Sequence, residues 1–269
     1  MNRRSYLAGV SAAGLLAGCT DALVLGDAGA SPRDPPERPA DLTPESVAPY
    51  VADYEEARVH NLHVERGADE VSVRAAATFD HAVGEDRYAT VRHAGTVSER
   101  VDGTRSVGEL AGDPTPYLVA PDRTLRFDLE RRTVDGEGTA TAEGAVSPPL
   151  GVRLLNATER DREVSVTVSR LRDSDAADGD DAADDDAADG DETVARSTES
   201  VLAESAVELR SLAGARGDYR VIARSADDGT TAEGRIETGI PGPDRAVIVD
   251  VVVDGDGVST RHLPALDPL

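Results

Sequence analysis

The stretch that decides the fold is Gly151–Val168, with the sequence GVRLLNATERDREVSVTV. Residues 152–156 have the composition of a short strand, and residues 157–160 that of a turn. Valine then alternates with polar residues, at Val164, Val166 and Val168. Because side chains with a period of two lie on one face of a strand, the stretch predicts two strands joined by a turn, each with one face in a core.

The same pattern continues to the C-terminus. Strands are expected at 193–201, 206–212, 218–223, 231–238 and 246–253. Short strands with turns about every eight to twelve residues predict an antiparallel β-sandwich over residues 151–269. The segments GVRLLNATERDREVSVTV, AESAVELRSL and RGDYRVIARSADDGTTAEGRIETG resemble the immunoglobulin-like β-sandwich domains of archaeal surface proteins. That resemblance implies an architecture and no activity.

Residues 42–147 show a different pattern, which predicts a small α+β domain. Ser46 is the expected N-cap of a helix and Gly67 its stop. The residues expected on the buried face are Val47, Tyr50, Val51, Tyr54 and Ala57, with Asp53, Glu55 and Glu56 opposite. Strands are expected at 71–79, 88–101, 115–120, 124–134 and 139–146. The predicted fold class is therefore mainly β, with one helix on an antiparallel meander followed by an immunoglobulin-like β-sandwich.

The composition is strongly acidic. The net charge is −24, all 28 basic residues are arginine, and there is no tryptophan. The tract Asp175–Glu192 holds ten acidic residues, so its removal would still leave the chain at about −14. An acidic surface without lysine resembles the proteins of halophilic archaea, whose carboxylates retain water and cations at molar salt, where charge repulsion is screened within about 3 Å. This charge excludes nucleic acid as a partner.

The N-terminus has the features of an export signal. Arg3 and Arg4 precede a short apolar stretch at 6–17, which is too short to span a bilayer. These features resemble a twin-arginine signal, and Leu16, Ala17, Gly18 and Cys19 resemble a lipobox. The resemblance implies removal of residues 1–18, lipid on Cys19, and a lipoprotein anchored on the external face of the cell membrane. Residues 19–41, rich in proline and glycine, are the expected flexible tether.

Three features are candidates for chemistry. The acidic tract at 173–192 does not have EF-hand spacing and is expected to be a disordered insertion between two strands. His60 and His63 could share a metal ion with a carboxylate, His81 or His93, although cationic residues are also common near a helix C-terminus. Asn156 begins an Asn-Ala-Thr sequon, where either a glycan or an ordinary turn is expected.

The remaining inventory excludes several functions. With the only cysteine lipidated, no thiolate is left for a blue-copper site or for thiol catalysis. There is no G-x-S-x-G motif and no phosphate-binding glycine loop. We therefore expect no cofactor, and a non-catalytic binding or envelope-structural role with a protein partner. The alternatives are a small-ligand or cation sensor with a pocket under the helix, and a carboxylate- or metal-dependent hydrolase.

Overall fold

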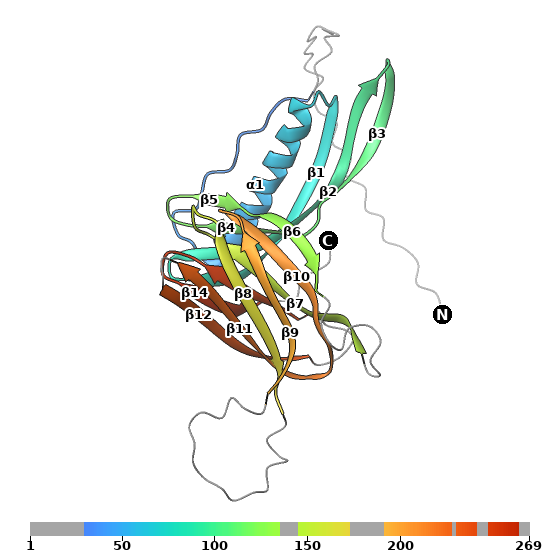
Figure 1. Ribbon diagram of the computed structural model, residues 1–269. Coiled ribbons are helices and arrows are strands. Elements are labelled where there is room, and N and C mark those ends of the chain that lie inside the picture. Colours follow the sequence, from blue (N-terminus) through green and yellow to red (C-terminus); the bar gives the residue numbers. More distant parts are fainter. Residues whose placement is uncertain (1–29, 135–144, 173–190, 228–229, 241–246, 264–269) are drawn as a thin grey trace, which may run out of the picture.

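The computed structural model describes residues 30–134, 145–172, 191–227, 230–240 and 247–263. Within them the chain is mainly β, with one helix and fourteen strands in three sheets (Figure 1). The helix covers the first sheet, and the other two sheets pack face to face as a β-sandwich, which confirms the predicted fold class. No helix among the described residues combines the length and the apolar character needed to cross a membrane.

The first unit consists of one helix and sheet A, whose strands all pair antiparallel in the order β1-β2-β4-β5. β3 pairs with the C-terminal half of β2, and the β2–β3 hairpin projects beyond the rest of the sheet (Figure 1). The elements of this unit are α1 (Pro44–Glu65), β1 (Glu70–Val83), β2 (Asp86–Val101), β3 (Thr104–Ala111), β4 (Thr115–Val119) and β5 (Thr124–Arg126).

Helix α1 begins three residues earlier than expected. Thr43 is the N-cap and forms a reciprocal capping box with Ser46, which occupies the third helical position and is not the cap. A proline follows the cap, at Pro44, where its missing N–H costs nothing. The helix ends as expected at Gly67, whose positive φ of 88° reverses the chain toward β1.

The face that α1 buries includes one residue that the sequence analysis placed in solvent. The expected apolar residues Val47, Tyr50 and Val51 are buried against sheet A, and Ala57 is buried as well. Glu55, expected on the polar side, is fully buried. It follows Val51 by one turn, so it belongs to the same row of side chains. A carboxylate in that position needs charged partners, which are described below.

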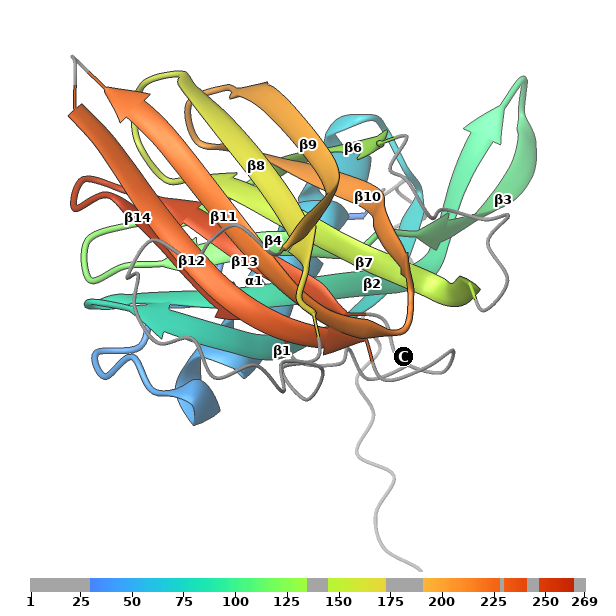
Figure 2. The same cartoon turned by 60° about the horizontal axis from the view of Figure 1, so that its bottom comes forward.

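The second unit is the sandwich (Figure 2). Sheet B has the order β14-β13-β7-β10-β6, and sheet C the order β12-β11-β8-β9. Valines, leucines and alanines from both inner faces form the core. The strands are β6 (Asp128–Thr133), β7 (Ala145–Asn156), β8 (Arg162–Arg170), β9 (Glu192–Val201), β10 (Ser205–Ala215), β11 (Gly217–Asp227), β12 (Thr230–Ile240), β13 (Ile248–Val253) and β14 (Val258–His262).

The fold-deciding stretch joins the two sheets of this sandwich. Its two strands, β7 and β8, lie in opposite sheets. The turn between them therefore connects sheet B to sheet C and does not close a hairpin. Sheet C is antiparallel throughout, whereas sheet B contains two parallel pairs, β7 with β13 and β6 with β10. β6 falls within the range 42–147 expected for the first domain, yet it is an edge strand of the sandwich.

The two units share a second core. Tyr88, Leu118 and Phe127 of the first unit pack against Leu155 and Val252 on the outer face of sheet B. All five side chains are fully buried. An outer sheet face normally meets water, but here it is covered by the first unit. The two ranges expected as separate domains therefore form one continuous body.

The described part of the expected tether is bonded to the helix. The backbone of Arg33 exchanges two hydrogen bonds of 2.8 Å with the side-chain amide of Asn61. The carbonyl of Ser31 lies 2.8 Å from Nε2 of His60. Residues from Ser31 onward are thus fixed along α1, which shortens the segment that could act as a free tether.

Candidate functional site

The residues of the predicted export and anchoring signal lie outside the described part of the chain. These are Arg3, Arg4, Leu16, Ala17, Gly18 and Cys19. The acidic tract at 173–192 lies outside it as well, except for its last two residues. Of these, Asp191 forms an ion pair with Arg220, and Glu192 begins β9.

Asn156 has the environment of a structural residue. Its side chain is fully buried, and Nδ2 donates to the carbonyls of Arg160, Val201 and Leu202 at 2.7, 3.1 and 3.0 Å. Its Oδ1 accepts from Thr158, the third residue of the sequon. A glycan on Nδ2 would displace these bonds, so the folded chain does not present Asn156 for glycosylation.

The histidines do not converge on one point. His60 is buried against the segment that precedes α1, while the side chain of His63 is partly exposed, and burial together with the charge of Arg66 lowers its pKa. His81 contacts Asp250, and His93 contacts Glu55. Across the described residues, no three or more histidine, cysteine or acidic side chains are grouped so that they could hold a metal ion. His60 and His63 therefore gain no third ligand there.

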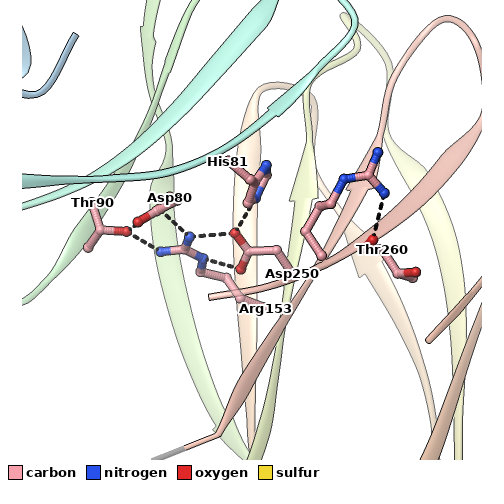
Figure 3. Close-up of polar contacts among 7 residues, drawn as sticks. Asp80, His81, Thr90, Arg153, Asp250 and Thr260 are labelled. Atoms are coloured by element: carbon pink, nitrogen blue, oxygen red, sulfur yellow. Dashed lines mark hydrogen bonds and ion pairs between the residues drawn. The ribbon is translucent and has the colours of Figure 1, made fainter. Parts of the chain in front are cut away.

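The first charged cluster lies between the two units and is termed the seam network (Figure 3). Arg153 on β7 donates to both carboxylate oxygens of Asp250 on β13, at 2.8 and 2.7 Å. The same guanidinium reaches back to sheet A, where it donates to Asp80 at 2.9 Å and to the hydroxyl of Thr90 at 2.7 Å. His81 lies 2.8 Å from Asp250. All five side chains are buried, so this network fixes one unit against the other.

The two carboxyl groups of the seam network have opposite shifts in pKa. Burial and the charge of Asp250 raise the pKa of Asp80 more than Arg153 and Thr90 lower it. For Asp250, the charge of Arg153 and the hydrogen bonds from His81 and Arg153 outweigh the effect of burial and hold the pKa below its usual value. Among the described residues, Oδ1 of Asp80 and Nδ1 of His81 have no hydrogen-bond partner.

The second charged cluster surrounds Glu55 and is termed the helix cluster. Arg58 forms two hydrogen bonds with this carboxylate, at 2.7 and 2.9 Å, and the hydroxyl of Tyr117 donates a third at 2.5 Å. Nδ1 of His93 lies 3.0 Å away and Nε of Arg126 lies 3.8 Å away. Burial would raise the pKa of Glu55, but these hydrogen bonds and charges lower it further than burial raises it.

The helix cluster opens onto a cleft where sheet A meets the sandwich, which is termed the seam cleft. Its volume is about 610 Å³, within the usual range for ligand sites. Its walls come from both units: His93, Gly112, Asp113, Thr115, Arg126, Asp128, Leu129, Glu130, Arg131, Ser200, Leu202, Ser205, Ala206 and Val207. This is the candidate functional site, because charged side chains that are fixed from behind line a cavity that neither unit forms alone.

Neither cluster was predicted from the sequence. His93 was considered only as a metal ligand, and the arginines of the cleft were not considered as site residues. One signal was present: Leu154 and Leu155 are adjacent apolar residues in a strand, and a strand that is apolar on both faces is covered on both faces. That signal indicates that a further layer of the structure covers the outer face of this strand. It does not indicate which side chains contact one another there.

Comparison of the chain with protein-family models, with curated proteins and with solved structures found no match. The function is therefore inferred from the geometry of the seam cleft and from the N-terminal sequence.

Proposed function

We propose that this chain is a cell-surface binding protein, held on the external face of the membrane by lipid on Cys19, that takes up its ligand or partner in the seam cleft without catalysing a reaction. The observation that carries the proposal is the seam network. It fixes the two units through fully buried ion pairs, so the cleft between them is preformed. A preformed site loses less conformational entropy on binding, which favours affinity.

The remainder of the proposal comes from the sequence. A lipobox resemblance at residues 16–19 and paired arginines at 3–4 support twin-arginine export and lipid anchoring. The acidic, lysine-free composition supports an archaeal protein adapted to molar salt. An immunoglobulin-like sandwich is consistent with a role in the cell envelope, with a protein partner there.

The geometry favours the seam cleft over a pocket under the helix. The space between α1 and sheet A is filled by apolar and aromatic side chains, among them Val47, Tyr50, Val51 and Tyr117. This packing counts against a sensor pocket in that place. The hydrolase alternative gains no specific support, since no nucleophile in the cleft is hydrogen-bonded to His93 among the described contacts.

The experiment uses the single cysteine. Because Cys19 is the only cysteine and its sulfur carries the lipid in the mature protein, Leu202→Cys gives a unique attachment point for a photo-cross-linker at the cleft. Val107→Cys on β3 is the matched control, since Leu202 and Val107 are the exposed large apolar side chains of the described residues, at 60% and 62%. We expect an adduct with an envelope component at molar salt from L202C only. Equal capture by both variants, or none, contradicts binding in the cleft.

Anchoring is tested on the same cells. We expect Cys19→Ser to release the protein from the membrane fraction, because the lipid is then absent. Retention of C19S in the membrane contradicts the anchor, whatever the cross-linking experiment gives.

A further inference from the structure

The charged side chains of the seam cleft are sorted by depth. The basic residues lie in its inner wall: the side chains of His93, Arg126 and Arg131 are 16%, 29% and 22% exposed. The acidic residues stand at its rim, where Asp113 and Asp128 are 80% and 92% exposed. Behind the basic side chains lie two carboxylates, Glu55 against His93 and Arg126 and Glu208 against Arg131, which hold them in place.

Each of the two inner guanidinium groups pairs with an exposed carboxylate at the rim. Arg126 donates from Nη1 to Asp128 at 2.8 Å, and Arg131 donates from Nη1 to Asp113 at 3.1 Å. Their Nε atoms are buried and face carboxylates behind the wall, with Arg126 at 3.8 Å from Glu55 and Arg131 at 3.3 Å from Glu208. Nη2 of Arg131 donates to the carbonyl of Pro114 at 2.9 Å. Asp113 and Asp128 extend into solvent, at 80% and 92% exposed, so an incoming carboxylate can take their place on the Nη1 atoms without leaving a buried charge unpaired.

The cleft also has an apolar wall. Leu129, Leu202 and Val207 line it together with Ala206. Leu202 is 60% exposed, and among the described residues Val107 is the one other large apolar side chain that is exposed. It lies in the turn between β9 and β10, and Glu204 in the same turn has a positive φ of 53°. A strained turn that holds an apolar side chain in solvent is a feature found at ligand sites.

We propose that the seam cleft binds an organic carboxylate whose apolar part packs on Leu202, with the carboxylate on Arg131 and Arg126. This inference rests on the proposed function and names its ligand chemistry. Guanidinium groups suit a carboxylate because their planar donors match its two oxygens. Such a ligand is either a free acid or the C-terminal carboxylate of a peptide.

The test compares matched probes on the full-length protein in detergent at molar salt, by calorimetry. We expect 4-methylpentanoate to bind at least about tenfold more tightly than 4-methylpentanamide, which has the same apolar part without the charge. The tripeptide acetyl-Ala-Ala-Leu with a free C-terminus separates the two sources. Tighter binding of the tripeptide than of the free acid assigns a chain terminus, and the reverse order assigns a small acid. Equal binding of acid and amide overturns the proposal.

Variants give the second arm of the test. Arg131→Gln should weaken binding of the acid about tenfold or more. The control is Arg220→Gln on sheet C, because Arg220 is 19% exposed and also paired with two carboxylates but lies outside the cleft. Equal affinities in R131Q and R220Q contradict the proposal.

Two exposed positions keep the test decisive if R131Q fails to fold. Leu202→Ser should weaken binding about threefold or more, with no change in Tm, because the side chain is largely in solvent. Asp128→Asn should strengthen binding of the acid, because it removes a competing carboxylate from Arg126. Weaker binding in D128N, or unchanged binding in L202S, overturns the assignment.

The ligand chemistry and the proposed function fail separately. If L202C captures an envelope component in cells but no carboxylate probe binds, the cleft is a binding site for other chemistry. If both experiments are negative, the cleft is not a binding site and the proposed function fails with it.

Discussion

The seam network and the helix cluster both bury charge, but they differ in how many carboxylates each guanidinium serves. In the seam network, one guanidinium on Arg153 serves two carboxylates, Asp80 and Asp250. In the helix cluster, one carboxylate on Glu55 is served by Arg58 and Arg126, with Tyr117 as a further donor. The first cluster is short of donors and the second has an excess of them.

This difference assigns the clusters different roles. The seam network is closed, because all of its side chains are buried and the hydrogen bonds described for them join members of the network. The helix cluster reaches the surface. His93 and Arg126 contact Glu55 in the interior, and the same two side chains line the seam cleft. A closed cluster can set the position of two units, whereas an open one can set the positions of side chains that meet a ligand.

The largest expected effect is the loss of the shared guanidinium. Arg153→Met leaves two buried carboxylates without a counter-charge, so we expect the free energy of unfolding to fall by about 3–5 kcal/mol. Denaturant titration at molar salt measures it. Arg220→Met on the outer part of sheet C is the control and should cost at most about 1 kcal/mol.

The stability lost in R153M should be recovered when the two carboxylates are removed as well. A triple variant, Asp80→Leu with Arg153→Met and Asp250→Leu, removes the charges together with their partner. Because well-packed apolar groups often replace a buried ion pair without loss, we expect the triple variant to recover most of the stability. A triple variant as unstable as R153M would show that packing, and not unpaired charge, caused the loss.

The two carboxylates of the seam network should respond differently to neutralisation. Asp250 accepts three hydrogen bonds, from Arg153 and His81, so we expect Asp250→Asn to cost about 2–3 kcal/mol. Asp80 has one oxygen without a partner and a raised pKa, so Asp80→Asn should change stability by less than about 1 kcal/mol. Equal losses in the two variants would contradict the unequal sharing of Arg153.

The architecture was predicted from the sequence because it depends on periodicity. Alternating valines at Val164, Val166 and Val168 indicated a strand with one buried face, and these side chains do lie in the sandwich core. The helix stop at Gly67 was predicted for the same kind of local reason. Thr43 was missed as the N-cap because Ser46, three residues on, has an equally suitable hydroxyl, and only the backbone distinguishes them.

The candidate site was not predicted, because it depends on contacts between distant segments. Arg153 lies on the face of β7 opposite Val152 and Leu154, which a two-layer sandwich would leave in water. It is buried because sheet A covers that face. Glu55 was assigned to the polar side of α1, although the series Val47, Val51, Glu55 and Val59 recurs every four residues and all four are buried. That spacing was available in the sequence and gave the correct face.

Removing the charge of Glu55 from the helix cluster should cost less stability than removing the charge of Arg153 from the seam network. Glu55→Gln removes the carboxylate, but Arg58 and Arg126 are about a third exposed and can be hydrated. We expect a loss of about 2 kcal/mol, mainly from the hydrogen bonds of Arg58 and Tyr117. Denaturant titration beside R153M measures it. A loss in E55Q larger than in R153M would reverse the proposed order of the two clusters.

The smallest expected effect is in the pH dependence of the free energy of unfolding. Glu55 should stabilise the fold more as the pH rises, and Asp80 should stabilise it less. The pKa of Glu55 is lowered on folding, so its contribution to stability is present above its unfolded pKa and is lost as the pH falls through the folded value. The pKa of Asp80 is raised, so its contribution is present below its unfolded pKa and is lost as the pH rises through the folded value. We expect E55Q to lose less stability than the native chain on acidification below pH of about 4.5.

Above pH of about 4, Asp80→Asn should lose less stability than the native chain as the pH rises toward neutrality, because the native chain must ionise a buried group there and the variant does not. Unfolding free energies from pH 3 to 7 at molar salt measure both slopes, with Arg220→Gln as the control that changes neither. Parallel profiles in D80N and the native chain would mean that Arg153 neutralises both of its carboxylates equally. In that case the contrast between a donor-poor seam network and a donor-rich helix cluster would lose its electrostatic basis.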